Sequence, residues 1–291
     1  MKDISVIIVT YNSERVIKAC LESIIRETKR HSFEIIVSDN DSKDQTSKIV
    51  SEFNNATLIL NNANLGFAKA NNIGFKQADG KYILFLNPDT EIRDGAIDIL
   101  LDKMEQDTSA QMATGAIFYP DGRQQPNIKR NPTLLSQLVI SLKLTRLPKQ
   151  WGSLNTFLAK DFNYGQEASV EQIMGACILV RYDDFKEIGG WDEDYFIWFE
   201  DIELCLAYQS RGWVIKYYPQ AKIYHHESEA FKRQPPLRNQ RWFLRSLRIF
   251  ARKHWFPLGY ILICLATPIA IILTIVGLAL GSRPKTQSEL R

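Results

Sequence analysis

The sequence predicts an α/β fold in which a mainly parallel sheet lies between two layers of helices. A basic amphipathic helix and an apolar C-terminal segment follow it. Three observations support this prediction. Apolar runs alternate with helical patterns over the first 90 residues, which is typical of parallel sheets. Residues 232–254 hold eight basic residues and no acidic one, and residues 258–280 carry no charge.

The expected strands are continuous apolar runs, as in strands that are buried on both faces. Each helix between them repeats its apolar residues with helical spacing. The expected strands cover 4–9, 33–37, 57–60, 82–86 and 175–181, and the expected helices cover 14–29, 43–53, 66–77 and 134–144. We also expect a hairpin turn at 120–122 and a flexible flap at 151–164.

Composition excludes several classes of protein. An apolar fraction of 45% excludes a disordered chain. The four cysteines form no CxxC pair, which argues against a zinc ribbon or a disulfide scaffold and favours a reducing compartment. No GxGxxG follows a strand, so an ordinary dinucleotide fold is not supported. The chain opens on an apolar strand rather than a leader, so we expect the body in the cytosol.

Polar clusters directly follow four of the expected strands. Residues 10–12, 38–44, 61–66 and 87–90 are rich in Asn, Asp, Ser, Thr and Gly. Any one cluster could be turn chemistry, since these residues form turns. Ligands of parallel sheets bind beyond the carboxyl ends of the strands, so four such clusters together predict a binding site.

The side chains in these clusters suit a phosphorylated ligand. Asp89 could hold Mg²⁺ or Mn²⁺, which bind a few protein oxygens and leave other positions to substrate phosphates. Asp39 could accept a hydrogen bond from a pyrimidine imide, and Asn64 and the Asn71–Asn72 pair offer neutral groups.

A second acidic cluster lies among aromatic residues at 191–201. It combines Asp192, Glu193, Asp194, Glu200 and Asp201 with large rings. A solvated acidic helix face would explain the acids, but a partly dry cleft, in which a carboxylate acts as a general base, explains the rings as well. The later pair His225–His226 is either structural or a source of one metal ligand.

The C-terminal region predicts an association with membranes. Five arginines are spaced three and four residues apart and form one helical stripe: Arg238, Arg241, Arg245, Arg248 and Arg252. This stripe could bind anionic headgroups, hold a diphosphate, or only set topology. Nucleic acid is a weaker partner, because the body is acidic.

The uncharged segment 258–280 is long enough to span a bilayer, although a buried core helix has the same composition. Pro268 near its middle could kink a spanning helix or mark a re-entrant one. We expect four regions, namely a catalytic body at 1–231, a juxtamembrane helix at 232–257, a membrane segment at 258–280 and a polar tail at 281–291.

Together these motifs resemble the family-2 inverting glycosyltransferases, which have the GT-A fold, a Rossmann-like αβα sandwich. The likeness covers about residues 4–230 and looks closest to the rhamnosyltransferase-like branch. It rests on the order and spacing of residues 6–12, 37–44, 64–72, 86–90, 175–176 and 189–201.

The resemblance implies roles for individual residues. Asp39 resembles the residue that binds the nucleotide base, and Asp201, which follows Glu200, resembles the catalytic base. Asn87-Pro88-Asp89 replaces the family's DxD motif, so that Asp89 is the metal ligand and Asn87 a neutral contact. His225 resembles the late histidine that completes the metal site, and His226 does so less. The remaining donor contacts are Thr10, Tyr11, Asn12, Asn64, Gly66 and Asn71, and the acceptor contacts are Trp191, Asp192, Glu193, Arg238, Arg241 and Arg245.

The implied activity is metal-dependent transfer of a sugar, with L-rhamnose from dTDP-rhamnose as the first expectation. The acceptor would be a saccharide linked to a polyprenyl diphosphate or another lipid. The reaction would serve polysaccharide synthesis of the cell envelope, on the cytoplasmic face of the inner membrane. Transfer of galactose or glucose from a UDP-sugar and a non-catalytic, membrane-anchored binder of sugar nucleotides are the alternatives.

Overall fold

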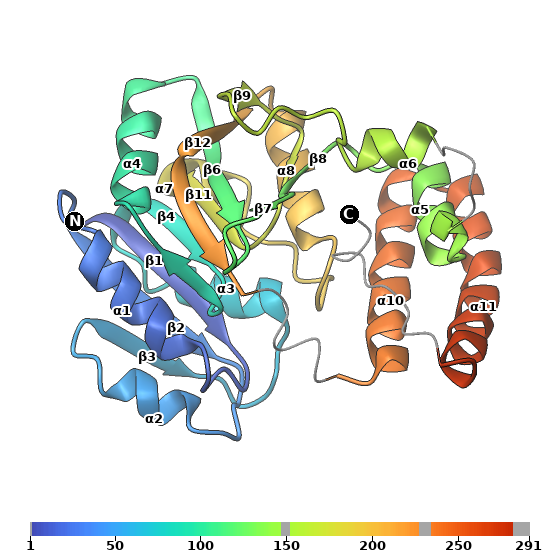
Figure 1. The fold of residues 1–291 in the computed structure, drawn as a ribbon, viewed down its shortest axis with the longest axis horizontal. Helices are drawn as coiled ribbons and strands as arrows, with labels where there is room; N and C mark the ends of the chain where they lie inside the picture. The colour runs from blue at the N-terminus through green and yellow to red at the C-terminus, as the bar shows by residue number, and fades with distance from the viewer. Residues whose placement is uncertain (1, 147–151, 227–233, 282–291) are drawn as a thin grey trace.

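The computed structural model describes residues 2–146, 152–226 and 234–281, and one mixed sheet of ten strands forms its centre (Figure 1). The main strand order is β3-β2-β1-β4-β11-β6-β12-β5. These strands are β1 (Lys2–Thr10), β2 (Phe33–Asp39), β3 (Ala56–Leu60), β4 (Gly80–Leu86), β5 (Thr90–Ile92), β6 (Ala110–Phe118), β11 (Cys177–Arg181) and β12 (Val214–His225). The short strands β7 (Gln124–Gln125) and β9 (Ala168–Ser169) pair with β6 and β12. A separate pair joins β8 (Ile128–Lys129) to β10 (Gln172–Ile173).

The α/β fold class is confirmed, and in the main strand order only β11 and β5 run antiparallel to the other strands. Strands β3, β2, β1 and β4 are parallel, as the sequence predicts. Strand β11 runs antiparallel to both β4 and β6, and β12 is parallel to β6. The elements expected in the first 90 residues are present, with ends shifted by at most three residues. Strands β6 and β12 are not among the strands expected from the sequence.

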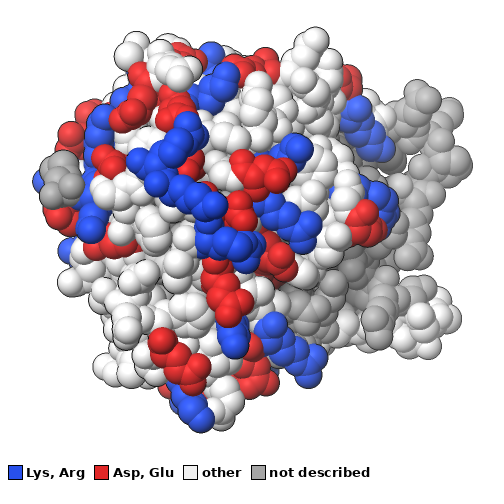
Figure 2. Space-filling view, turned by 60° about the vertical axis from the view of Figure 1, so that its left-hand side comes forward, with Lys and Arg blue, Asp and Glu red and all other residues white. Residues whose placement is uncertain are grey.

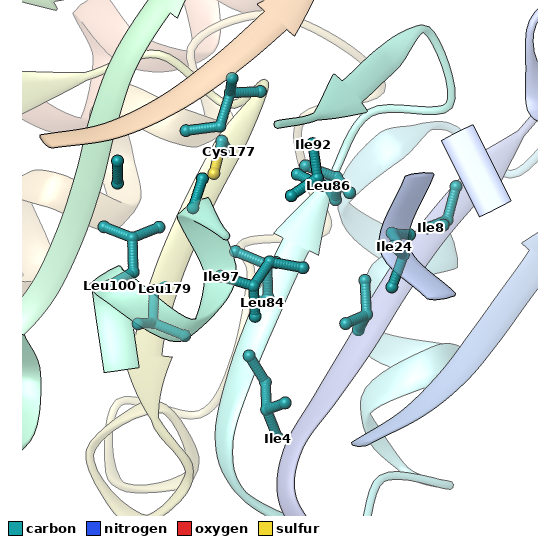
Figure 3. Close-up of a cluster of buried hydrophobic side chains, with 14 of the residues drawn as sticks. Ile4, Ile8, Ile24, Leu84, Leu86, Ile92, Ile97, Leu100, Cys177 and Leu179 are labelled. Carbon is teal, nitrogen blue, oxygen red and sulfur yellow. The ribbon is translucent and has the colours of Figure 1, made fainter. Parts of the chain in front are cut away.

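Helices cover both faces of the sheet. They are α1 (Ile17–Glu27), α2 (Thr46–Ser51), α3 (Phe67–Phe75), α4 (Ala96–Gln106), α7 (Tyr182–Glu187) and α8 (Glu200–Ser210). Side chains of a strand alternate between the faces. Ile8 and Leu84 pack with α1 and α4 on one face, as Figure 3 shows, and Ile7 and Phe85 pack with α3, α7 and α8 on the other.

A third hydrophobic core lies beside the sheet, in a group of helices on the right of Figure 1. This group contains α5 (Leu134–Ser141), η1 (Leu144–Arg146), α6 (Gly152–Phe157), α10 (Pro236–His254) and α11 (Leu258–Ala279). The flap expected at 151–164 is wrong for the described residues from 152 on. They form α6 and a turn, and Leu154, Phe157 and Leu158 are buried in the third core. Residue 151 lies outside the described residues.

Helix α11 is continuous through Pro268 and is long and apolar enough to cross a membrane. Over an 18-residue stretch of α11 the mean hydropathy is 2.7, and 22% of that stretch is buried. Ile263 and Ala270 belong to the third core and Ala266 is also buried, while Leu265 and Ile272 are exposed. Length and composition therefore make it a candidate membrane segment.

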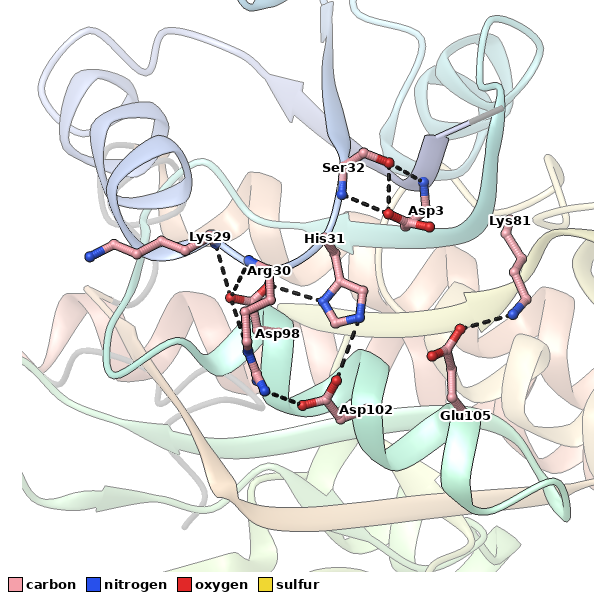
Figure 4. Close-up of polar contacts among 9 residues, drawn as sticks. All are labelled: Asp3, Lys29, Arg30, His31, Ser32, Lys81, Asp98, Asp102 and Glu105. Carbon is pink, nitrogen blue, oxygen red and sulfur yellow. Dashed lines mark hydrogen bonds and ion pairs between the residues drawn. The ribbon is translucent and has the colours of Figure 1, made fainter.

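The edge of the sheet at the amino ends of the parallel strands is held by ion pairs and hydrogen bonds (Figure 4). Asp98 of α4 accepts backbone N–H bonds from Lys29 and Arg30 and contacts His31 Nδ1 at 3.1 Å. Arg30 also pairs with Asp102 at 2.7 Å. Figure 2 shows basic and acidic side chains interspersed on a face that includes this side of the molecule. These contacts fix the connection between α1 and β2 against α4. The polar loops lie at the opposite edge of the sheet.

Replacement of Leu84 by Ala tests the first core. Leu84 is fully buried in β4, so we expect Leu84→Ala to lower the free energy of unfolding by about 2–5 kcal/mol. Thermal unfolding in detergent would measure the loss. The exposed Leu60→Ala should stay within about 0.5 kcal/mol of the wild-type protein. An unchanged stability of Leu84→Ala would contradict the packing described here.

Candidate functional site

Asp39 ends β2 and is held by hydroxyl and backbone donors from three directions. Thr10 Oγ1 at the end of β1 donates to Asp39 Oδ1 at 2.7 Å, because the two strands pair with Thr10 opposite Asp39. Ser42 donates through its backbone N–H at 3.0 Å and through its hydroxyl at 2.5 Å. Ser47 Oγ donates to Oδ2 at 3.1 Å. Asp39 is buried, so these donors fix the direction of its carboxylate.

The loop after β1 is tied to the loop after β2 through Asn12. Its backbone N–H donates to Ser42 Oγ at 2.8 Å, and its side-chain oxygen accepts the Lys43 N–H at 2.8 Å. Asn12 has a φ of 52°, a left-handed conformation that Asn tolerates better than most residues. Tyr11 is half-buried beside it. The predicted residues Thr10, Tyr11, Asn12 and Asp39 therefore form one group, to which the structure adds Ser42 and Ser47.

Gly66 begins α3 in close contact with the second acidic cluster. Its φ is 87°, and a Cβ atom there would lie 2.4 Å from the carbonyl oxygen of Phe196. The next residue, Phe67, donates its N–H to that same oxygen at 2.9 Å. Asn64 Oδ1 accepts the Gly66 N–H at 3.1 Å and shapes this turn. The loop after β3 is thereby joined to the segment that precedes Asp201.

Of the neighbouring amides, Asn72 rather than Asn71 bridges two loops. Asn71 Nδ2 donates to Phe67 O inside α3, so this amide nitrogen is already occupied within its own helix. Asn72 accepts the Trp191 N–H at 2.9 Å and donates to Trp191 O at 2.9 Å and to Glu193 at 3.0 Å. The sequence could not distinguish the two residues, because only the helix phase decides which one faces the loop.

Trp191 belongs to the core, and its ring is not available to an acceptor. It is 2% exposed, and its ring lies 5.4 Å from Phe67 and 5.0 Å from Phe85, between ring centroids. The expected acceptor contact at Trp191 is therefore wrong. Trp191 follows the double glycine and packs against α3, and this packing anchors the loop. Asp192 and Glu193 come next in the chain, and Glu193 is exposed.

Asp89 and His225 lie side by side at the carboxyl end of β4. Strand β12 pairs with β5, with His225 opposite Thr90, and this register puts His225 Nε2 3.2 Å from Asp89 Oδ1. His226 contacts Glu91 instead, at 2.7 Å. Burial raises the pKa of Asp89, but His225 more than offsets this and holds the pKa of that carboxyl below its usual value. Asn87 is half-buried and donates its backbone N–H to Ala176 O.

The donor chemistry of this pair fits a divalent cation. A carboxylate oxygen and an imidazole nitrogen converge, and the Nδ1 atom of His225 lies 3.0 Å from Oε1 of the fully buried Gln125. This contact suits a proton on Nδ1, which leaves the lone pair of Nε2 for a metal. Metal-binding histidines commonly donate their other ring N–H to a neighbouring polar group in this way. Two protein ligands leave room for phosphate oxygens and water. Among the described residues no group of three or more His, Cys, Asp or Glu forms a complete cage.

Glu200 and Asp201 form the first turn of α8, next to the loop that precedes β11. Gly175 N–H donates to Asp201 Oδ2 at 3.2 Å, and Ile202 N–H donates to Oδ1 at 2.9 Å. Glu200 is 7% exposed, and its Oε2 has no hydrogen-bond partner among the residues that the structure describes. The Asn87 N–H donates to Ala176 O, and Ala176 follows Gly175, which binds Asp201. This hydrogen bond joins the loop that carries Asp89 to the loop that holds Asp201.

Burial raises the pKa of both carboxyls of α8. The charge of Asp201 adds to burial in raising the pKa of Glu200 well above 4.5. The pKa of Asp201 is raised above 3.8 although the nearby Lys129 cation and backbone N–H groups lower it. Of the two carboxyls only Asp201 is partly exposed, and a partly exposed carboxyl with a raised pKa has the properties of a general base.

The predicted arginines lie on the outer side of α10. Arg238, Arg241 and Arg245 are all exposed, as the helical spacing predicts. The opposite side of α10 is buried in the third core through Phe243, Leu247 and other residues.

Replacement of Glu200 by Gln tests its protonation. A carboxyl whose pKa is raised by folding stabilises the fold below its ordinary pKa of 4.5, and this stability is lost as the pH rises toward the folded pKa. We expect Glu200→Gln to flatten the fall of the melting temperature above pH 4.5. Thermal unfolding between pH 4.5 and 8.5 would measure it, with the exposed Glu105→Gln as a control that keeps the wild-type slope. An equally steep fall in both variants would contradict the assignment.

Comparisons with known proteins identify the family of this chain. Residues 5–188 match the model of "Glycosyl transferase family 2", and residues 149–282 match "Glycosyl transferase family group 2". The N-acetylglucosaminyl-diphospho-decaprenol L-rhamnosyltransferase of Mycobacterium tuberculosis is 29% identical over 79% of this chain and 78% of its own length. The rhamnosyltransferase WbbL of Escherichia coli K12 is 28% identical over 85% of this chain and 92% of its own.

A solved structure shares the fold. The mannosyltransferase PcManGT from Pyrobaculum calidifontis, in complex with GDP-Man and Mn²⁺, superposes with a TM-score of 0.57 over 97% of this chain and 77% of its own, at 17% identity. The GT-A-like fold is thus shared at low identity, and the family model covers more than half of the chain. This chain therefore belongs to glycosyl transferase family 2, and it is a rhamnosyltransferase-like glycosyltransferase.

Proposed function

We propose that the protein transfers a sugar from a nucleotide-diphosphate donor to a lipid-linked saccharide, with inversion at the anomeric carbon. The observation that carries this proposal is the pair of sites joined by the β4–β11 contact. Asp89 and His225 lie on one side, and Asp201 lies on the other. The first suits a diphosphate leaving group, and the second suits an attacking hydroxyl.

Asp201 acts as the general base in this proposal. It takes the proton of the acceptor hydroxyl while that oxygen forms its bond to the anomeric carbon and the bond to the donor diphosphate breaks. Attack from the face opposite the leaving group inverts the configuration. A divalent cation, Mg²⁺ or Mn²⁺, held by Asp89 and His225 would neutralise charge on the leaving diphosphate.

The donor base binds at Asp39. Its carboxylate accepts hydrogen bonds from Thr10, Ser42 and Ser47, and the Ser47 contact is the longest of these at 3.1 Å. An imide N–H of thymine or uracil would take the place of such a donor. The names of the two rhamnosyltransferases support rhamnose as the transferred sugar, and we take dTDP-rhamnose as the donor. A UDP-sugar would use the same carboxylate, so the sugar must be decided by experiment.

The acceptor side faces the C-terminal helices. The exposed Arg238, Arg241 and Arg245 lie on α10, which leads into the apolar α11. Guanidinium groups match the geometry of phosphate oxygens. We infer that α11 anchors the protein at the cytoplasmic face of the inner membrane and that the arginines bind the polyprenyl diphosphate of the acceptor. The decaprenol acceptor in the name of the M. tuberculosis relative supports a role in the synthesis of envelope polysaccharides.

Replacement of Asp201 by Asn tests the base. We expect a loss of turnover of about 10²–10⁴-fold, because the amide accepts no proton, while donor binding stays unchanged. Transfer rates and the thermal shift caused by dTDP-rhamnose with Mn²⁺ would measure the two effects. The exposed Asp183→Asn should behave as the wild-type protein.

Three outcomes of this test would redirect the proposal. Retained turnover in Asp201→Asn would move the base to Glu200 or Asp192. A thermal shift with UDP-sugars alone would overturn the rhamnose donor. A wild-type protein that neither transfers sugar nor hydrolyses any donor would instead be a membrane-anchored binder.

Charge reversal on α10 tests the acceptor site. We expect Arg241→Glu/Arg245→Glu to raise the KM of a polyprenyl-diphosphate acceptor at least about tenfold, since each arginine near an anionic surface contributes about 1 kcal/mol. The donor KM should not change. Lys76→Glu/Lys186→Glu, at exposed positions directly after α3 and within α7, is the matched control. Equal effects on lipid-linked and lipid-free acceptors would contradict a diphosphate site.

A further inference from the structure

The segment that leads into Asp201 has an unfavourable backbone. Trp198 and Phe199 follow one another with φ of 62° and 71°, in the left-handed region. Bulky residues rarely adopt this conformation, and it persists only where surrounding structure holds it. Phe199 directly precedes the first turn of α8, so its conformation sets the direction in which Glu200 and Asp201 leave the loop.

The side chains that hold this segment come from α10, about 50 residues further along the chain. The Phe199 ring lies 5.2 Å from Phe250 and 5.8 Å from Phe243, between centroids. The ring centroid of Trp198 lies 6.4 Å from that of Phe243. The Ser246 hydroxyl donates to Ile197 O at 2.7 Å, and Ser246 is 2% exposed. The strained residues thus pack on α10.

The C-terminal end of α10 contacts residues both before and after Trp198 and Phe199. The Lys253 ammonium pairs with Asp192 and, at 2.9 Å, with Asp194. The next residue, His254, places its Nε2 2.9 Å from Glu203 Oε2 in α8, and Glu203 also accepts a hydrogen bond from the Tyr195 hydroxyl at 2.9 Å. Contacts of α10 therefore lie before and after the strained residues.

We propose that α10 is a positioning element of the active site, which acts through Ser246 and Lys253 to hold residues 192–203 in the conformation that directs Asp201 to the acceptor. The arginine stripe lies on the other side of the same helix. This inference rests on the proposed role of Asp201 as the base. It assigns α10 a function beyond binding of the lipid phosphate.

Lys253→Met and Ser246→Ala, made separately in the full-length protein in detergent, test the proposal. We expect each to lower kcat by about 10–100-fold through misplacement of the base, with the donor and acceptor KM within about twofold of the wild-type values. Amide hydrogen exchange in residues 195–202 should become faster. Lys253→Arg, which can pair with both carboxylates, should restore both readouts.

Matched controls are available elsewhere in the chain. Lys81→Met removes a surface pair with Glu105, and Ser210→Ala removes a hydroxyl bond within α8 to Ala207 O. Both should keep wild-type kcat and exchange.

Unchanged kcat and exchange in Lys253→Met and Ser246→Ala would overturn the proposal. A raised acceptor KM at constant kcat would also overturn it, because Lys253 would then contact the acceptor. If the wild-type protein transfers no sugar, the proposed function fails. Hydrogen exchange then decides alone whether α10 holds the segment.

Discussion

The antiparallel pairing of β11 with β4 is the constraint on which the site depends. Leu86 at the end of β4 lies opposite Cys177 at the start of β11. The loop after β4 and the loop before β11 therefore meet at one edge of the sheet. The Asn87 N–H bond to Ala176 O closes this meeting point, with Asp89 on one side and the Gly175 anchor of Asp201 on the other. In an all-parallel sheet these two loops would lie at opposite edges.

Much of the polar cluster at the strand ends can be predicted from sequence, because its side chains directly follow the strands that carry them. Asp39 and Asp89 stand at strand ends that are visible as apolar runs, and parallel strands bring their ends together. The surroundings of the second acidic cluster are less accessible to such reasoning. Asn72 and Trp191 lie 119 residues apart and meet only in the folded chain. Trp191 therefore looked like a surface aromatic of an acidic loop, whereas it packs beneath that loop in the second core.

Gln125 and the contacts of the buried side of α10 also lacked a sequence signal. Gln125 orients His225 from a two-residue strand, which is too short to produce a periodic pattern. The arginine stripe of α10 follows a clear helical period, and its exposure agrees with that period. The partners of the buried side of α10 do not follow from the period. That side meets residues 192–203, about 50 positions earlier in the chain, and no local pattern encodes this contact.

The position of Ser246 and Lys253 on α10 restricts how the chain can vary in length. The two residues are seven positions apart, close to two helical turns, and Phe243 and Phe250 repeat the same interval. A single residue inserted between them would rotate everything that follows by about 100°. The lysine would leave its two carboxylates, and the arginines beyond the insertion would turn toward the core. Insertions and deletions in relatives should therefore be absent from Phe243–Lys253 and confined to the connections on either side of the helix.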